Sequence, residues 1–361
     1  MMIFILIFAG QTECNALYLN GKIRKKVEEL TARSEKILIV CHVNPDGDAV
    51  GSAIALADYL QSVKGKEVSI LSPNYLQEFL LWMDGADGIL IYKRNRRKAE
   101  KAIDGCDLMF FLDFNNPERL GDARRAILRR DVPKIIIDHH IDPVPFADVT
   151  ISDTSFSSTA EIVHQVVTSL NDGQPYSSDS YNTGIYTGVV TDTGNFVHGS
   201  FNGDTLRLVA GLLDAGIDRE RVHDRLYNNF SEKRMRLVGM VLSQRMVVLT
   251  EYRTAYMWLT REDLKRYSYA KGDTEGLVNM PLSISGLRMS ALFIEKEGFV
   301  KVSFRSKGDL SVNDFAVSYF NGGGHRNAAG GEYSDTLESA LGRFKDSLKL
   351  FMAGEDGQEL P

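Results

Sequence analysis

Cysteine is scarce in this chain. Its 361 residues include three cysteines, Cys14, Cys41 and Cys106, and no CxxC pair. This scarcity excludes a disulfide framework and a zinc ribbon. Two of the three lie in apolar runs of strand length, where a buried and unreactive thiol is the usual case. We therefore expect a protein of a reducing compartment, the cytoplasm.

A net positive charge is also lacking, because 48 acidic residues outnumber 42 basic ones and leave a formal charge of -6. Binding of long duplex nucleic acid calls for a basic surface, so the composition argues against that partner. A small nucleotide or a short oligomer at a local positive site stays open. The 43% hydrophobic and 25% charged contents are those of a soluble globular protein.

Long apolar runs are lacking beyond the N-terminus, so no membrane partner is expected. Met1 to Gly10 is apolar, but it has no positively charged start and is too short to span a membrane. We treat residues 1–17 as an apolar extension and expect the folded protein to begin near Leu17. Residues 353–361 are expected to form a frayed tail.

Apolar runs of strand length alternate with helical patterns over residues 18–230. The predicted strands are 36–41, 67–71, 106–113 and 132–138, and the predicted helices are 22–33, 53–63, 157–170, 204–214 and 219–226. Residues 181–192 have the β-branched content of a strand, but the spacing of Gly184 and Gly188 favours a closely packed helix. This alternation predicts an α/β domain with a mostly parallel sheet flanked by helices.

The pattern changes after residue 230. A charged helix over 231–245 is expected to connect to a region, 246–352, that mixes strands and helices. Its predicted strands are 246–249, 254–259, 289–295 and 300–305, and its predicted helices are 313–319 and 337–351. This mixture predicts a second, smaller α+β domain.

The stretch from His42 to Asp48, His-Val-Asn-Pro-Asp-Gly-Asp, directly follows the first predicted strand. One imidazole and the carboxylates of Asp46 and Asp48 in a tight turn suit a hard or borderline cation. The alternative is an acidic turn that only caps the following helix. His42 and the strand–loop–helix context favour the metal site.

Further aspartates and histidines end other predicted elements. Asp113 and Asp138 close the third and fourth strands, His139 and His140 follow, and Asp192 ends the 181–192 segment. Each alone fits a cap or a solvated turn, but ligand sites of parallel sheets lie beyond the carboxyl ends of the strands, so these clusters should meet. Two histidines and four aspartates are too many for one ion with an open position and suit a two-metal centre with a bridging carboxylate. The metal-ligand candidates are His42, Asp46, Asp48, Asp113, His139 and Asp192.

Residues 321–331 are rich in glycine and read Asn-Gly-Gly-Gly-His-Arg-Asn-Ala-Ala-Gly-Gly. Consecutive glycines let backbone N–H groups approach an anion, and arginines add donors that suit phosphate. A flexible turn is the alternative, but the His-Arg pair and the helix start expected after it favour phosphate binding. The substrate-binding candidates are Arg305, Ser306, Gly322, Gly323, Gly324, His325 and Arg326.

In their order, these motifs resemble those of the DHH phosphoesterase superfamily, and residues 303–306 with the glycine-rich stretch are similar to its C-terminal DHH-associated domain. The likeness covers residues 20–352 and is greatest to the bifunctional nanoRNase and pAp phosphatase group. It implies a DHH domain over 18–230, a DHH-associated domain over 246–352 and an active site in the cleft between them. It also implies roles for residues: His42, Asp46 and Asp192 would hold one Mn²⁺, Asp48 and His139 a second, and Asp113 would bridge. Mg²⁺ stays open.

The resemblance further assigns His140 to the scissile phosphate and Asp138 to orienting the site, so that the catalytic candidates are His140, Asp113 and Asp138. It implies exo-acting hydrolysis of short oligoribonucleotides or linear dinucleotides, and of 3′-phosphoadenosine 5′-phosphate (pAp). Cyclic dinucleotides and pyrophosphate are alternative substrates. A non-catalytic nucleotide-binding protein is the alternative of another class, although every expected ligand is present. A homodimer stays open.

Overall fold

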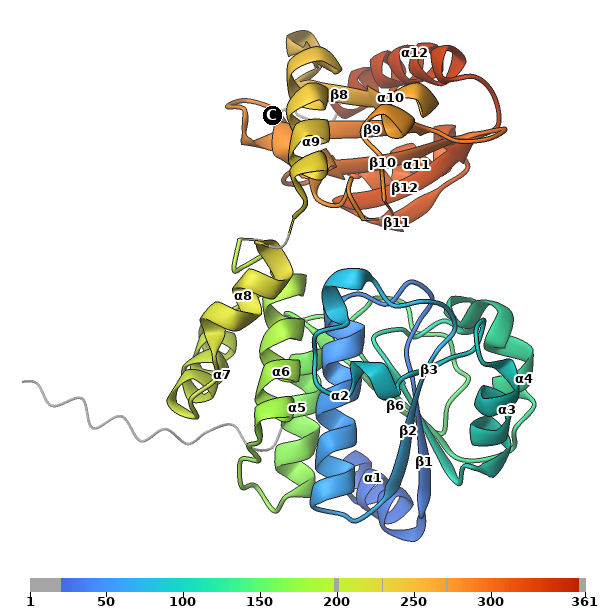
Figure 1. The fold of residues 1–361 in the computed structure, drawn as a ribbon, viewed down its shortest axis with the longest axis vertical. Helices are drawn as coiled ribbons and strands as arrows, with labels where there is room; N and C mark the ends of the chain where they lie inside the picture. The colour runs from blue at the N-terminus through green and yellow to red at the C-terminus, as the bar shows by residue number, and fades with distance from the viewer. Residues whose placement is uncertain (1–20, 198–200, 229, 271, 357–361) are drawn as a thin grey trace, which may run out of the picture. The chain divides into compact units, whose positions relative to one another are not determined.

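The computed structural model describes residues 21–197, 201–228, 230–270 and 272–356, so that the expected N-terminal extension and the end of the tail lie outside it (Figure 1). The chain divides into two compact units, residues 1–229 and 230–361. In the part of the chain that is described, no helix combines the length and apolarity needed to cross a membrane.

A six-stranded, all-parallel sheet forms the centre of the first unit, in the order β3-β2-β1-β4-β5-β6. The two edge strands, β3 and β6, were not predicted, because they are only two and four residues long. The strands are β1 (Lys36–Val40), β2 (Glu67–Ser72), β3 (Leu90–Ile91), β4 (Leu108–Leu112), β5 (Lys134–Asp138) and β6 (Val149–Ser152).

Helices cover both faces of this sheet. Ile37 and Ile39 of β1 face a core shared with α2, α5 and α6, whereas Leu38 and Val40 face a core shared with α3 and α4. This explains why β1 is a continuous apolar run. The helices are α1 (Gly21–Arg33), α2 (Gly47–Ser62), α3 (Arg96–Gly105), α4 (Arg124–Leu128), α5 (Thr159–Leu170), α6 (Asp179–Asp192), α7 (Gly203–Asp214) and α8 (Arg219–Tyr227), with the 3₁₀ turns η1 (Glu78–Leu80), η2 (Ala86–Gly88) and η3 (Pro117–Ala123).

Two helix boundaries matter for the site. α2 begins at Gly47, six residues before the predicted start, because Asp46 caps it and accepts a hydrogen bond from the Ala49 N–H at 3.1 Å. α6 is the helix that the glycine spacing favoured, and it packs against α2 at backbone contact. A Cβ at Gly184 would lie 2.6 Å from the carbonyl oxygen of Gly51. Only glycine permits this approach.

The second unit is built on a mixed six-stranded sheet in the order β11-β12-β10-β9-β8-β7, in which only the β8–β9 pair is parallel. Phe293, Phe304, Phe315, Phe320 and Phe344 form the centre of its main core. Its strands are β7 (Met246–Leu249), β8 (Thr254–Leu259), β9 (Met289–Glu295), β10 (Val300–Ser306), β11 (Gly323–His325) and β12 (Ala328–Tyr333). Its helices are α9 (Glu232–Gln244), α10 (Arg261–Arg266), α11 (Val312–Tyr319) and α12 (Leu337–Asp356), with the 3₁₀ turns η4 (Thr250–Tyr252) and η5 (Leu277–Ser283).

The helix expected after His325 and Arg326 is wrong. Residues 323–333 form the β11–β12 hairpin instead, and β12 pairs along β10 from Val300 to Arg305. Glycine at 331 lets β12 pass close to the end of α11, because a Cβ there would lie 2.5 Å from the carbonyl oxygen of Phe320.

Candidate metal centre

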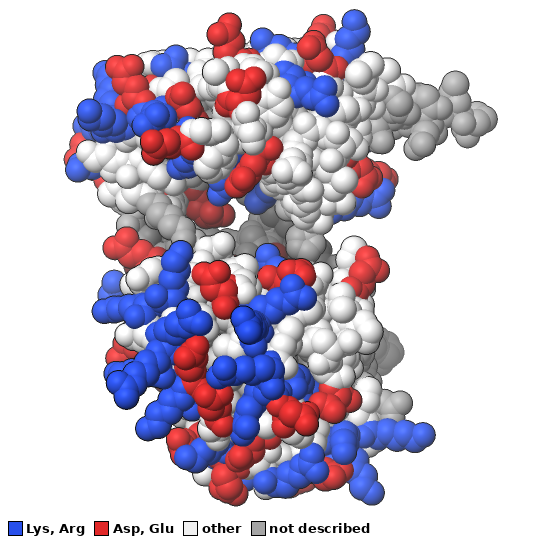
Figure 2. All heavy atoms as spheres, turned by 90° about the vertical axis from the view of Figure 1, so that its right-hand side faces the viewer, with Lys and Arg blue, Asp and Glu red and all other residues white. Residues whose placement is uncertain are grey.

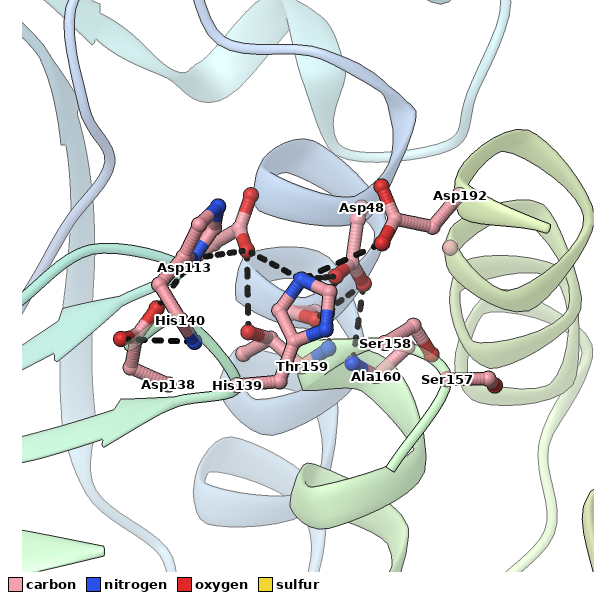
Figure 3. Close-up of polar contacts among 12 residues, drawn as sticks. Asp48, Asp113, Asp138, His139, His140, Ser157, Ser158, Thr159, Ala160 and Asp192 are labelled. Carbon is pink, nitrogen blue, oxygen red and sulfur yellow. Dashed lines mark hydrogen bonds and ion pairs between the residues drawn. The ribbon is translucent and has the colours of Figure 1, made fainter. Parts of the chain in front are cut away.

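Three neighbouring parallel strands bring their polar ends to one edge of the first sheet. His42 lies two residues beyond β1, Asp113 directly follows β4, and His139 directly follows β5. Figure 3 shows Asp113 and His139 pointing toward each other, with Asp48 of α2 and Asp192 of α6 beside them. The convergence expected of strand ends therefore occurs.

Asp113 lies between two histidines and is buried. One carboxylate oxygen is 3.3 Å from Nε2 of His42, and the other is 3.6 Å from Nε2 of His139. The Thr159 hydroxyl donates to the second oxygen at 3.0 Å. Asp113 also has a φ of 66°, a left-handed conformation that costs a non-glycine residue energy and is found most often at functional sites. The carboxylate is thus oriented to face two partners at once.

The expected ligands fall into two groups, each with its donor atoms within 4.8 Å of one another. One group contains His42, Asp46 and Asp113, and the other contains Asp48, His139 and Asp192. A third group joins Asp113 with His139 and His140. The expected division differs from this grouping, because it placed Asp192 with His42 and Asp46.

Packing between α2 and α6 explains why Asp192 lies beside Asp48 and His139. A Cβ at Gly188 would lie 2.6 Å from Oδ1 of Asp48, so α6 approaches α2 on the side that carries Asp48. One turn further along α6, Asp192 places Oδ2 3.1 Å from Nε2 of His139.

The N-terminus of α5 holds Asp48, which sequence analysis did not foresee. The backbone N–H groups of Thr159 and Ala160 donate to its two oxygens at 2.6 and 2.8 Å, and the Ser52 hydroxyl donates at 3.2 Å. Unpaired N–H groups at a helix start favour a carboxylate. The Ser158-x-x-Glu161 spacing is a helix-start signal, but it cannot tell which carboxylate the helix will meet.

Asp138 orients His140. Its Oδ1 lies 2.7 Å from Nδ1 of the ring, and its Oδ2 accepts the His140 backbone N–H at 3.1 Å. Burial lowers the pKa of His140, but the hydrogen bond and the charge of Asp138 outweigh it and raise the pKa above its ordinary value. His140 is therefore suited to donating a proton or a hydrogen bond.

Arg119 of η3 is a second residue that sequence analysis missed. Its Nη2 lies 3.0 Å from Nδ1 of His42, and the same ring nitrogen is 2.8 Å from the Val43 carbonyl oxygen. When Nδ1 carries the proton and donates to Val43, Nε2 is left with the lone pair that a metal needs. Arg119 cannot donate to a protonated Nδ1, and it then acts through its positive charge. Burial lowers the pKa of His42, and this charge lowers it further, which keeps the ring neutral. No motif marks Arg119, because it reaches the centre through the fold of η3.

In the second unit, some of the groups that were expected to bind phosphate already have hydrogen-bond partners within the fold. The Gly322 N–H donates to the Ala316 carbonyl and the Gly324 N–H to Oδ1 of Asn313 at 2.8 Å, so neither is available to an anion. This corrects the expectation of a backbone cradle at these two glycines. Gly323 pairs with Gly330 across the hairpin, and the His325 side chain lies outside the described part of the structure.

The remaining candidates of the second unit differ in their partners. Ser306 donates to the Leu310 carbonyl at 2.6 Å, and Arg326 contacts Asp309. Arg305 has only the Phe304 carbonyl as a hydrogen-bond partner, at 2.9 Å, and forms no ion pair with any described residue. Burial lowers the pKa of Arg305. A partly buried cation that forms no ion pair is stabilised when an anion binds it.

Comparisons with known proteins identify the family. Residues 36–189 match the DHH family, N-terminal domain, and residues 253–354 match the DHHA1 domain. The bifunctional oligoribonuclease and PAP phosphatase NrnA of Thermus thermophilus is 30% identical over 312 residues, which cover 86% of this chain and 87% of that protein. The chain belongs to the DHH family.

Solved structures agree with this assignment. An exopolyphosphatase-related protein from Bacteroides fragilis is 38% identical, with a TM-score of 0.90 over 93% of this chain and 98% of that one. RecJ of Thermus thermophilus, in complex with Mn²⁺, covers 92% of this chain and 55% of that one with a TM-score of 0.54, and at 15% identity it shows the fold alone. The predicted superfamily and fold are confirmed, and the protein is a hydrolase of the DHH phosphoesterase family.

The electrostatics of this DHH site fit divalent cations. Burial and the neighbouring Asp48 raise the pKa of Asp113 well above its usual range. Burial, followed by the charges of nearby aspartates, also raises the pKa of Asp48 to about 7 and that of Asp192 to about 9. Burial and His140 lower the pKa of His139 to about 4, which keeps its imidazole neutral. Bound cations would relieve the repulsion among these carboxylates, and neutral imidazole is the form that ligates metals.

Proposed function

We propose that this hydrolase is a Mn²⁺-dependent phosphoesterase that acts from the ends of short oligoribonucleotides and linear dinucleotides and also dephosphorylates pAp. The observation that carries the proposal is Asp113, whose two oxygens face two separate groups of ligands. The name of the Thermus thermophilus relative, an oligoribonuclease and PAP phosphatase, supports this choice of substrates.

Two ions fit the donor set better than one. Asp113 with His42 and Asp46 would hold the first, and Asp48, His139 and Asp192, together with Asp113, would hold the second. Each group mixes oxygen with one imidazole nitrogen, which Mn²⁺ accepts more readily than Mg²⁺, an ion that prefers oxygen and water. When bound, such a pair supplies Lewis acidity at both the attacking and the leaving oxygen of a phosphoryl displacement.

The protein's own residues would orient the phosphate and neutralise its charge. His140, oriented by Asp138, would donate a hydrogen bond to a non-bridging oxygen and stabilise the charge that develops there. Arg305 would bind a more distant phosphate or sugar oxygen of the substrate, because its partly buried guanidinium forms no ion pair with a described residue. A contact made equally in the bound substrate and in the transition state contributes to substrate affinity.

A substrate panel tests the proposal. The full-length protein, stripped of metal and reconstituted with Mn²⁺ or Mg²⁺, is assayed on pApA, pAp, cyclic di-AMP and pyrophosphate. We expect turnover of pApA and pAp with Mn²⁺, and at least a thousandfold loss in Asp113→Asn, since that change removes the bridging charge (about 4 kcal/mol of transition-state stabilisation). Asp214→Asn, which changes an exposed aspartate at the end of α7, is the matched control.

Three outcomes would contradict the proposal. Preference for cyclic di-AMP or pyrophosphate would replace the proposed substrates. Undiminished turnover by Asp113→Asn would refute the bridging role of that carboxylate. Protein that binds pAp with Mn²⁺ but never hydrolyses it would favour the non-catalytic alternative.

A further inference from the structure

Basic residues are concentrated in one part of this acidic chain. Residues 93–134 contain 12 of the 42 lysines and arginines but only seven of the 48 acidic residues, whereas the whole chain has a net charge of -6. These residues include α3, η3 and α4. Figure 2, which looks onto the side of the first unit where α3 and α4 lie, shows lysine and arginine side chains covering much of that face.

Most of this positive charge is not neutralised locally. Three of the acidic residues are already paired with other arginines. Glu100 pairs with Arg96 at 3.0 Å, Asp104 pairs with Arg129 at 3.0 Å, and Glu118 pairs with Arg124. Six exposed cations form no ion pair with any residue that the structure describes. They are Lys93, Arg94, Arg97, Lys98, Lys101 and Arg125.

The cations at the start of α3 lie where they are unfavourable for the helix. The first turn of α3 contains Arg96, Arg97 and Lys98 and no acidic residue, and its N-cap, Asn95, makes no side-chain capping bond. The partial positive charge of a helix N-terminus disfavours cations there. Packing does not explain them either, because Ala99 and Ile103 form the buried face of α3. Cations at a helix start that neither capping nor packing explains indicate a role in binding, and their charge indicates an anionic ligand.

The basic residues begin at the edge of the sheet where the metal centre lies. α3 follows β3, and η3 with α4 follows β4, so both helices start at the carboxyl ends of the parallel strands. Arg119 of η3 contacts His42 at 3.0 Å. The ion pair between Asp104 of α3 and Arg129, which directly follows α4, joins the two helices near their other ends. Cations therefore extend from the metal centre along the outer faces of both helices.

We propose that this basic surface, defined as the outer faces of α3 and α4 with Lys93 and Arg94, binds the sugar–phosphate backbone of single-stranded RNA whose end occupies the metal centre. The inference rests on the proposed function, which makes an RNA end the substrate. Flexible lysines and forked guanidiniums suit a row of phosphates. An acidic protein fits less well, because no exposed large hydrophobic side chain lies within 92–134 to anchor it.

Charge reversal tests the surface. Arg97→Glu/Lys101→Glu changes two exposed residues one turn apart on α3, and Lys25→Glu/Lys26→Glu makes the same charge change on exposed residues of α1. Binding of a fluorescent 24-nucleotide oligouridylate and of a trinucleotide is measured in EDTA, which prevents hydrolysis, over a range of salt concentrations. Hydrolysis of pApA with Mn²⁺ is measured in parallel.

The wild type should bind the 24-mer with a steep salt dependence. The α3 variant should bind it about tenfold more weakly and with a shallower salt dependence, since fewer counterions are released. The α1 variant should stay within about twofold of the wild type, and both variants should bind the trinucleotide and hydrolyse pApA as the wild type does. At position 97 glutamate is favourable, because it lies in the first turn of α3, and a thermal unfolding curve of the α3 variant checks that it folds.

Two results would overturn the proposal: equal affinity of the wild type and the α3 variant for the 24-mer, or an equal loss in the α1 variant. A wild-type protein that binds no 24-mer at low salt would also overturn it and would leave an acidic protein as the partner to examine. Salt-dependent binding of the 24-mer without hydrolysis of pApA would support the surface while contradicting the proposed function, so that the two failures are distinguishable.

Discussion

Gly184→Ala adds one methyl group in the middle of α6 and should destabilise the first unit. Alanine is intrinsically the better helix former, by roughly 0.5–1 kcal/mol over glycine in a helix interior. The new Cβ would lie 2.6 Å from the Gly51 carbonyl oxygen, where ordinary contact begins near 3.4 Å. The two helices would therefore have to separate by about 0.8 Å, the difference between these distances.

The steric cost should exceed the gain in helix propensity. Overpacking a well-packed interior costs about 1–3 kcal/mol, and here the obstacle is backbone, which cannot rotate away. With a steric cost at the upper end of that range, about 3 kcal/mol, and a propensity gain of about 1 kcal/mol, a net loss of about 2 kcal/mol is expected. Gly211→Ala is the matched control: it makes the same change inside α7, where a Cβ would meet nothing within 4 Å, and should stabilise by up to about 1 kcal/mol.

Calorimetry of the full-length wild type and both variants provides the assay. For a unit of about 200 residues, these values correspond to a Tm about 4–8 °C lower for Gly184→Ala and a few degrees higher for Gly211→Ala, in the transition of the first unit. Mn²⁺ affinity should also fall in Gly184→Ala only, because α2 and α6 carry Asp48 and Asp192. Equal shifts in the two variants would refute the account of the α2–α6 contact.

Two further predictions concern single side chains. Burial lowers the pKa of His164 to about 4 from 6.5, so the folded state resists protonation, and the free energy of unfolding should fall by at most about 3 kcal/mol as pH drops from 6.5 to 4. Urea unfolding at several pH values should show that His164→Gln lacks this part of the pH dependence. A variant with the same pH profile as the wild type would contradict the prediction. Arg305→Met should raise KM for pApA about tenfold with little change in kcat, since it removes a contact far from the reacting bond. Arg326→Met, the control, should change neither KM nor kcat. A loss in Arg305→Met that is confined to kcat would contradict the binding role of Arg305.

Sequence patterns predicted the site because its ligands follow strongly apolar strands. β1, β4 and β5 are recognisable as buried runs, and parallel strands necessarily bring their carboxyl ends to one edge, so His42, Asp113 and His139 could be expected to meet. The division of ligands between two groups could not be predicted. It depends on how closely Gly188 lets α6 approach Asp48, a distance that only tertiary packing sets.

The glycine-rich stretch shows how composition alone can mislead. Glycines at 322 and 324 suggested N–H groups open to an anion, but both N–H groups donate to acceptors on α11. The hairpin also has no room for a side chain at position 324, since a Cβ there would lie 2.5 Å from the Ala328 carbonyl oxygen. The contribution of Arg119 was invisible for the opposite reason. An arginine in a loop carries no periodic signal, and only the path of η3 brings it to His42.

The central claim is that Asp113 bridges two metal ions, and anomalous diffraction tests it most directly. Crystals of the metal-stripped protein are soaked in Mn²⁺, and data are collected near the manganese absorption edge. The account predicts two peaks per chain, one contacted by His42 and Asp46 and the other by Asp48, His139 and Asp192, with one oxygen of Asp113 at each. A single peak, or two peaks that do not share Asp113, would contradict it.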